Sequence, residues 1–103
     1  VMKCINCLLL IYLFIIGACG LATTRPKLEM SLSAAAFLAA KQAKAQRLAP
    51  GLYRKAEFFY LKAKSAYRRK YFNKAKQFAL KSQELSEKAE FIAKKKGELD
   101  AIQ

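Results

Sequence analysis

A nearly unbroken apolar stretch, residues 4–22, constrains the fold of this chain more than any other feature. It is about as long as the ~20 residues that cross a bilayer, and it lies where a leader peptide would lie. The rest of the 103-residue chain mixes Ala and aromatic residues with Lys and Arg. The sequence therefore divides into an apolar N-terminal segment and one small basic domain, since this length leaves no room for a second domain.

The apolar stretch has the order of parts found in a secretory signal peptide. Lys3 supplies a basic start, residues 8–16 an apolar centre, and Gly17 and Ala18 the small residues that precede cleavage. The letters IGAC, which end at Cys19, match the lipobox of bacterial lipoproteins, in which the cysteine thiol receives diacylglycerol. We predict a lipoprotein signal peptide over residues 1–18 and a lipid anchor on Cys19, so that the chain is held at a membrane.

An uncleaved membrane span is the alternative to lipidation. The many basic residues that follow the apolar stretch would then place the C-terminal part in the cytoplasm. In that topology a basic helical domain would bind nucleic acid, with Tyr53, Tyr60 and Tyr67 as stacking platforms. Their seven-residue spacing among other large apolar residues is more typical of a core, and the order of the lipobox favours the lipoprotein without nucleic acid.

Two further observations concern compartment and thiol chemistry. Gly20 follows the predicted lipid site, where an Asp commonly retains lipoproteins in the inner membrane, so we expect the outer membrane and a periplasmic domain.

Cys4 and Cys7 have CxxC spacing, but no His and no second cysteine pair accompany them. We therefore predict no metal site and no cofactor.

The mature part is predicted to be all-α. Residues 19–30 show no periodicity and form a tether, and residues 31–103 form a helical domain. An Ala-rich first helix, whose apolar face is poorly defined, ends before Pro50, which opens a second helix. Asn73 is the expected cap of a third helix.

Apolar stripes at helical spacing run along the second and third helices. In the second helix the stripe contains Leu52, Tyr53, Ala56, Phe59, Tyr60, Ala63, Ala66 and Tyr67. In the third helix it contains Ala75, Phe78, Ala79, Ser82, Leu85, Ser86, Ala89, Ile92 and Ala93. Because small residues let helix axes approach closely, we expect a three-helix arrangement with a central antiparallel hairpin and the first helix alongside.

The stretch LAPGLYRKAEFFYLKAKSAYRRKYFNKAKQFALKSQELSEKAEFIA resembles the domain of unknown function 4398 family, small periplasmic lipoproteins with a lipobox, a LAP turn and regularly spaced Ala and Tyr. The resemblance covers residues 34–96 and implies a fold and an envelope location, with no established activity. The helix pair is also similar to a tetratricopeptide unit, through Ala56, Tyr60, Ala63, Tyr71, Ala75, Phe78 and Ala79. The turn RRKYFNK is far more basic than the turn of that family.

Charge is the remaining functional signal. The chain has no His, and its acids lie among lysines at helical spacing, as Glu84 with Lys88 and Glu90 with Lys94, so we predict no catalytic site and no enzyme activity. From residue 41 through residue 81 the only acid is Glu57. We expect an interaction module or scaffold whose basic face contacts anionic lipid, cell-wall polymer or an envelope protein. The predicted polyanion contacts are Arg68, Arg69, Lys70, Lys74 and Lys76.

The lipobox generates a direct prediction for Cys19. Mass spectrometry of the protein purified from its own membrane should show loss of residues 1–18 and the added mass of diacylglycerol on Cys19. An intact N-terminus without lipid would contradict the lipoprotein interpretation.

Overall fold

The computed structural model describes residues 2–19 and 25–102, with side chains placed for residues 2–14 and 25–102. This part of the chain forms five helices and contains no strand, which confirms the expected all-α class. The helices are α1 (Met2–Cys19), α2 (Lys27–Gln42), α3 (Ala45–Leu48), α4 (Pro50–Arg68) and α5 (Phe72–Ile102).

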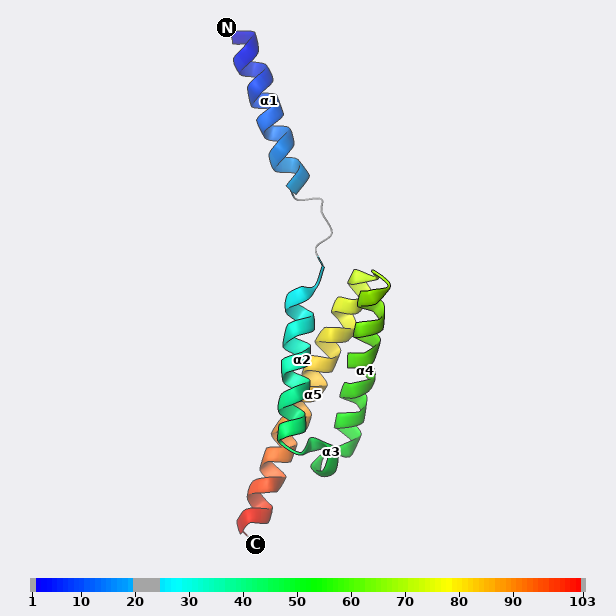
Figure 1. Ribbon diagram of the computed structural model, residues 1–103. Coiled ribbons are helices and arrows are strands. Elements are labelled where there is room, and N and C mark those ends of the chain that lie inside the picture. Colours follow the sequence, from blue (N-terminus) through cyan, green and yellow to red (C-terminus); the bar gives the residue numbers. More distant parts are fainter. Residues whose placement is uncertain (1, 20–24, 103) are drawn as a thin grey trace.

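Helix α1 stands apart from the other described helices (Figure 1). Its placed apolar side chains, such as Leu8 and Phe14, are exposed. Cys19 is the last residue of α1, but its side chain lies outside the described residues, as do residues 20–24 of the predicted tether. Within the described part of the chain, no helix combines the length and the apolar character needed to cross a membrane.

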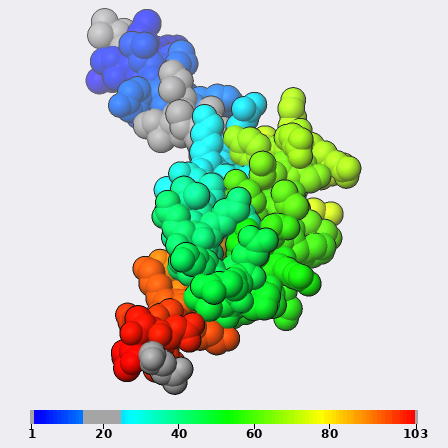
Figure 2. Space-filling view, turned by 60° about the horizontal axis from the view of Figure 1, so that its bottom comes forward, coloured from blue at the N-terminus to red at the C-terminus, as the bar shows by residue number. Residues whose placement is uncertain are grey.

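Helices α2, α4 and α5 pack side by side, and the short α3 connects α2 to α4 (Figure 1). Helix α4 runs antiparallel to α5, whereas α2 runs in the same direction as α5. The turn between α4 and α5 therefore lies at the end of the bundle where α2 begins, and α3 lies at the opposite end. We refer to residues 25–29 and 68–74 together as the tether end; Figure 2 shows its two parts, cyan and yellow-green, next to each other.

The first helix of the domain differs from the single helix expected from residue 31 to Pro50. It begins earlier, at Lys27, and it ends at Gln42. The chain changes direction there because Lys44 adopts a left-handed conformation, with φ of 62°. The four-residue α3 follows, and Pro50 then opens α4 as predicted.

The expected helix cap at Asn73 is wrong. Helix α5 begins one residue earlier, at Phe72, and the Tyr71 carbonyl accepts a hydrogen bond of 2.9 Å from the Ala75 N–H. Asn73 is therefore inside the first turn and exposed. The end of the preceding turn, and not an Asn side chain, sets where this helix starts.

The predicted apolar stripes of α4 and α5 form most of the core. Eight alanines are fully buried: Ala40, Ala45, Ala56, Ala63, Ala75, Ala79, Ala89 and Ala93. Between α4 and α5, Ser82 Oγ donates a hydrogen bond of 2.9 Å to the Ala56 carbonyl oxygen. A side chain as short as serine reaches the backbone of the next helix only where the two axes approach closely.

A single aromatic side chain attaches α2 to α4. The Phe37 ring is 8% exposed and stacks on two rings of α4, with centroid distances of 5.1 Å to Tyr53 and 5.2 Å to Tyr60. Burial raises the pKa of the Tyr53 hydroxyl, and the nearby Glu57 charge raises it further. The apolar face of α2, which the sequence defined poorly, therefore centres on Phe37.

The position of Phe37 predicts its contribution to stability. Because α1 contacts no other helix, residues 25–103 contain the whole described core. In this segment Phe37→Ala should lower the free energy of unfolding by about 3 to 5 kcal/mol, the usual cost of deleting a buried ring. Denaturant unfolding followed by circular dichroism measures this change.

Phe58→Ala is the matched control, because the Phe58 ring is 53% exposed on the same bundle. It should cost at most about 1 kcal/mol. Equal losses for the two variants would show that the Phe37 stack does not hold α2 in place.

Candidate functional site

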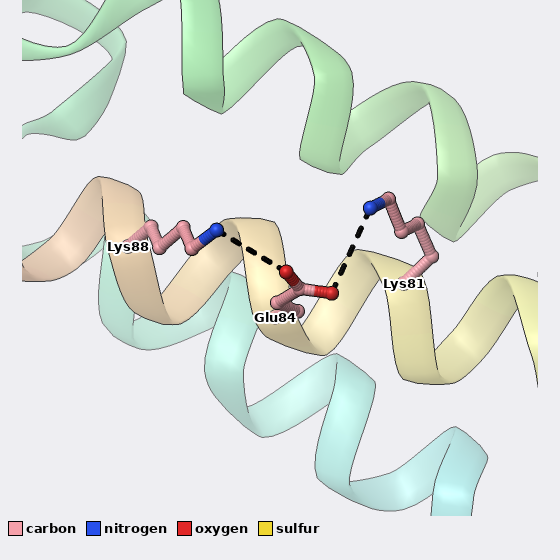
Figure 3. A network of polar contacts seen from close by, with 3 residues as sticks. All are labelled: Lys81, Glu84 and Lys88. Carbon is pink, nitrogen blue, oxygen red and sulfur yellow. Dashed lines mark hydrogen bonds and ion pairs between the residues drawn. The ribbon is translucent and has the colours of Figure 1, made fainter.

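Three acidic side chains of the described structure, Glu29, Glu84 and Glu90, are ion-pair partners of lysines. Lys88 Nζ lies 3.2 Å from Glu84 Oε1, and Lys94 Nζ lies 2.7 Å from Glu90 Oε1, which confirms the pairs predicted from the sequence. Figure 3 shows Glu84 between Lys88 and Lys81. The hydrogen bond from Lys88 and the charge of Lys81 hold the pKa of the Glu84 carboxyl below its usual value. Among the described residues no group of acids and cysteines could hold a metal ion.

The turn between α4 and α5 is closed by two backbone hydrogen bonds. The Tyr71 N–H donates to the Ala66 carbonyl at 2.9 Å, and the Lys70 N–H donates to the Tyr67 carbonyl at 3.1 Å. This pair of bonds is the Schellman motif, in which the residue after the helix takes a left-handed conformation and is usually Gly. Here that residue is Lys70, with φ of 66°.

The predicted polyanion contacts all lie near this turn, and all five are exposed. They are Arg68, Arg69, Lys70, Lys74 and Lys76. Lys76 faces α2, where its Nζ lies 3.7 Å from Glu29 Oε1, so its charge is partly balanced. The other four make no ion pair with a described residue. The structure thus brings four of the predicted cations together without a counter-ion.

Two shallow hollows lie at this turn. One, of about 400 Å³, is lined by Lys70, Tyr71, Phe72, Asn73 and Lys74. The other, of about 380 Å³, lies between α4 and α5, and its lining includes Lys62, Ala66, Arg69, Tyr71, Lys74 and Phe78. Tyr71 and Lys74 belong to both hollows, so the two form one continuous surface.

Sequence reasoning missed Lys62 and Tyr71 as members of this surface. Lys62 lies in α4, seven residues before Arg69, the capping residue that follows the helix, and both line the hollow between α4 and α5. That spacing was the available signal. Tyr71 is 57% exposed, and Lys74 Nζ lies 5.9 Å from its ring centroid. In the sequence, Tyr71 lies outside both apolar stripes, and this distinguishes Tyr71 from the core tyrosines.

Arg25 also belongs to the tether end. Its guanidinium carbon lies 5.9 Å from the centroid of the Phe72 ring, within the range of a cation–π contact. The chain just before α2 therefore touches the first residue of α5. Helix α5 has no acid in its first turn, so the partial positive charge of its N-terminus adds to these cations.

Two of the three tyrosines considered as base-stacking platforms, Tyr53 and Tyr60, belong to the core or pack against it. Tyr53 is 4% exposed and Tyr60 is half-buried, and both stack on Phe37. Tyr67 is half-buried, with its ring centroid 5.7 Å from that of Phe72. The core interpretation of their spacing is confirmed for Tyr53 and Tyr60.

Comparison with known proteins returns no family model, no curated protein and no solved structure that matches this chain. The resemblance to the domain of unknown function 4398 family therefore stays a prediction.

The left-handed Lys70 generates a stability prediction. A side chain with a Cβ in this conformation costs about 1 kcal/mol, which Gly avoids. Lys70→Gly in residues 25–103 should therefore raise the free energy of unfolding by roughly 0.5 to 1 kcal/mol. Lys70→Ala removes the same charge but keeps the Cβ, so it should give no comparable gain. Equal gains for both variants would assign the effect to charge repulsion instead of backbone conformation.

Proposed function

We propose that this chain is a lipid-anchored lipoprotein of the bacterial envelope, with Cys19 as the anchor. Its helical bundle acts as a non-enzymatic interaction module that rests the tether end on the anionic lipid surface of its own membrane. The lipobox letters IGAC support the anchor. Gly20, in place of a retaining Asp, supports an outer-membrane location facing the periplasm.

One observation carries this proposal: the tether enters the bundle at the same end as the basic turn. Arg25 lies against Phe72, and Glu29 of α2 pairs with Lys76 of α5. Only six residue steps separate Cys19 from Arg25, and an extended chain spans at most ~3.6 Å per residue, which gives roughly 20 Å. A lipid on Cys19 would therefore hold the basic turn close to the headgroups.

The charge of the tether end supports lipid as the anionic surface. Basic residues near an anionic leaflet contribute about 1 kcal/mol each. Arg68, Arg69, Lys70 and Lys74 lack a described acidic partner, so they lose no ion pair when they meet such a surface. Cell-wall polymer remains the competing surface for the same charges, and the experiment below compares the two.

We also propose that α4 and α5 form the tetratricopeptide-like hairpin of the domain of unknown function 4398 family. The antiparallel course of the two helices and the buried Ala56, Ala63, Ala75 and Ala79 at their contact support this assignment. Such a hairpin would present surfaces to an envelope partner while the opposite end stays on the membrane.

Vesicle sedimentation of residues 25–103 tests the orientation. The variant Arg68→Gln, Arg69→Gln, Lys70→Gln should bind vesicles of phosphatidylglycerol and phosphatidylcholine about two orders of magnitude more weakly than the unsubstituted segment. Binding should fall with added salt, and vesicles of phosphatidylcholine alone should bind neither protein.

The matched control is Arg47→Gln, Arg54→Gln, Lys55→Gln. It also removes two arginines and one lysine, but at the end of the bundle that contains α3. These residues are exposed, so the variant should fold and keep most of the binding. Equal losses for the two triple variants would contradict a preferred end. Tighter binding to isolated cell wall than to anionic vesicles would contradict lipid as the surface.

A further inference from the structure

The hollow between α4 and α5 concentrates positive charge without a counter-ion. Lys62, Arg69 and Lys74 line its volume of about 380 Å³. None of the three makes an ion pair with a described residue. The only acid from residue 41 through residue 81 is Glu57, and it does not line the hollow. This electrostatic environment selects an anion.

The same hollow has an apolar lining. Ala66 is 7% exposed and Phe78 is half-buried at the contact of the two helices. Lys62 lies between two rings, with its Nζ 5.6 Å from the Phe78 centroid and 4.9 Å from the Phe58 centroid. The exposed Tyr71 ring also lines the hollow and extends its apolar surface towards the tether end. The hollow therefore fits a molecule that is anionic at one end and apolar at the other.

We propose that this hollow binds the headgroup of one anionic phospholipid. The phosphate lies among Arg69, Lys74 and Lys62, and the first acyl methylenes lie along Tyr71, which lines the hollow on the side of the tether end and of the membrane. A guanidinium matches two phosphate oxygens with two parallel N–H donors, so Arg69 is the main phosphate ligand. The inference rests on the proposed function, because the tether end supplies the nearby membrane, and it adds a defined site to a general attraction.

Arg68 and Arg69 provide a matched pair for the test. Both are exposed arginines at the end of α4, and removing either lowers the net charge equally. Only Arg69 lines the hollow. If a diffuse electrostatic field attracts the lipid, the two substitutions should lower the lipid affinity equally. If the lipid binds in the hollow, only the substitution of Arg69 should lower it.

The experiment is an NMR titration of ¹⁵N-labelled residues 25–103 with dihexanoyl phosphatidylglycerol below its micelle concentration. Saturation at one lipid per chain is expected, with the largest amide shifts at Lys62, Tyr71, Lys74 and Phe78. Arg69→Gln should weaken binding about tenfold or more, the effect of losing one charge-assisted contact. Arg68 belongs to the surface that meets an extended anionic leaflet but does not line the hollow, so Arg68→Gln should change the affinity for one dispersed lipid molecule by less than about twofold. Equal weakening by the two variants, or shifts that never saturate, would overturn the site.

Two further ligands identify what the site recognises. Glycerol phosphate, which lacks acyl chains, should bind about tenfold more weakly or worse, since it leaves the aromatic lining uncovered. Dihexanoyl phosphatidylcholine should not saturate the hollow. Glycerol phosphate as tight as the lipid, or an acidic peptide tighter than the lipid, would overturn the phospholipid assignment.

The titration and the vesicle experiment fail in different ways. Equal losses for Arg68→Gln and Arg69→Gln, with the two triple variants still distinct on vesicles, would remove the site and leave the proposed orientation. A saturating titration that depends on Arg69, with both triple variants equal on vesicles, would support the site and contradict the orientation.

Discussion

The close approach of α4 and α5 is the constraint on which the rest of the structure depends. Buried alanines line this contact, and Ser82 Oγ reaches the Ala56 carbonyl across it. A contact built from such small side chains buries little area per residue, so larger rings must complete the core at its edges. Phe37, Tyr53 and Tyr60 do this by stacking where α2 meets α4. The long basic side chains remain on the outside, where they carry the charge of the domain.

The turn between α4 and α5 connects the two helices of that contact. Its left-handed position contains Lys70, a residue that lowers the stability of the turn relative to Gly. Two backbone hydrogen bonds from Lys70 and Tyr71 close the helix end in a geometry that suits Gly. A lysine at this position costs conformational free energy but adds a cation to the tether end. Departures from local preference are expected where function competes with stability. The same turn places Arg69 and Lys74 on one hollow.

The periodicity of apolar residues was sufficient to predict the all-α fold class and the buried faces of α4 and α5, because each apolar stripe lies within one continuous segment of the sequence. The break after α2 could not be predicted, since Lys44 takes its left-handed conformation without the Gly or Asn that normally signals it. The cap at Asn73 failed for a related reason, because the Lys70 turn already fixes the start of α5.

Much of the candidate site could likewise be predicted from one short segment, because most of its basic residues lie close together in the sequence around the turn. The contribution of Arg25 depends on how α2 and α5 are placed in space, which no single segment encodes. The pairing of Lys76 with Glu29 joins residues of two different helices and was equally hidden. The predicted lipid on Cys19 stays a prediction of the motif, because its side chain lies outside the described residues.

In the proposed orientation the tether end faces the membrane that holds the anchor. The chain has no tryptophan, so Tyr71→Trp and, separately, Leu99→Trp give single fluorophores at opposite ends of the bundle. Both native side chains are exposed. The lipidated protein would be reconstituted into anionic vesicles that contain phospholipids brominated near the headgroup. We expect strong quenching of the tryptophan at position 71, relieved by salt, and little quenching at position 99. Equal quenching at both positions, or stronger quenching at position 99, would contradict it.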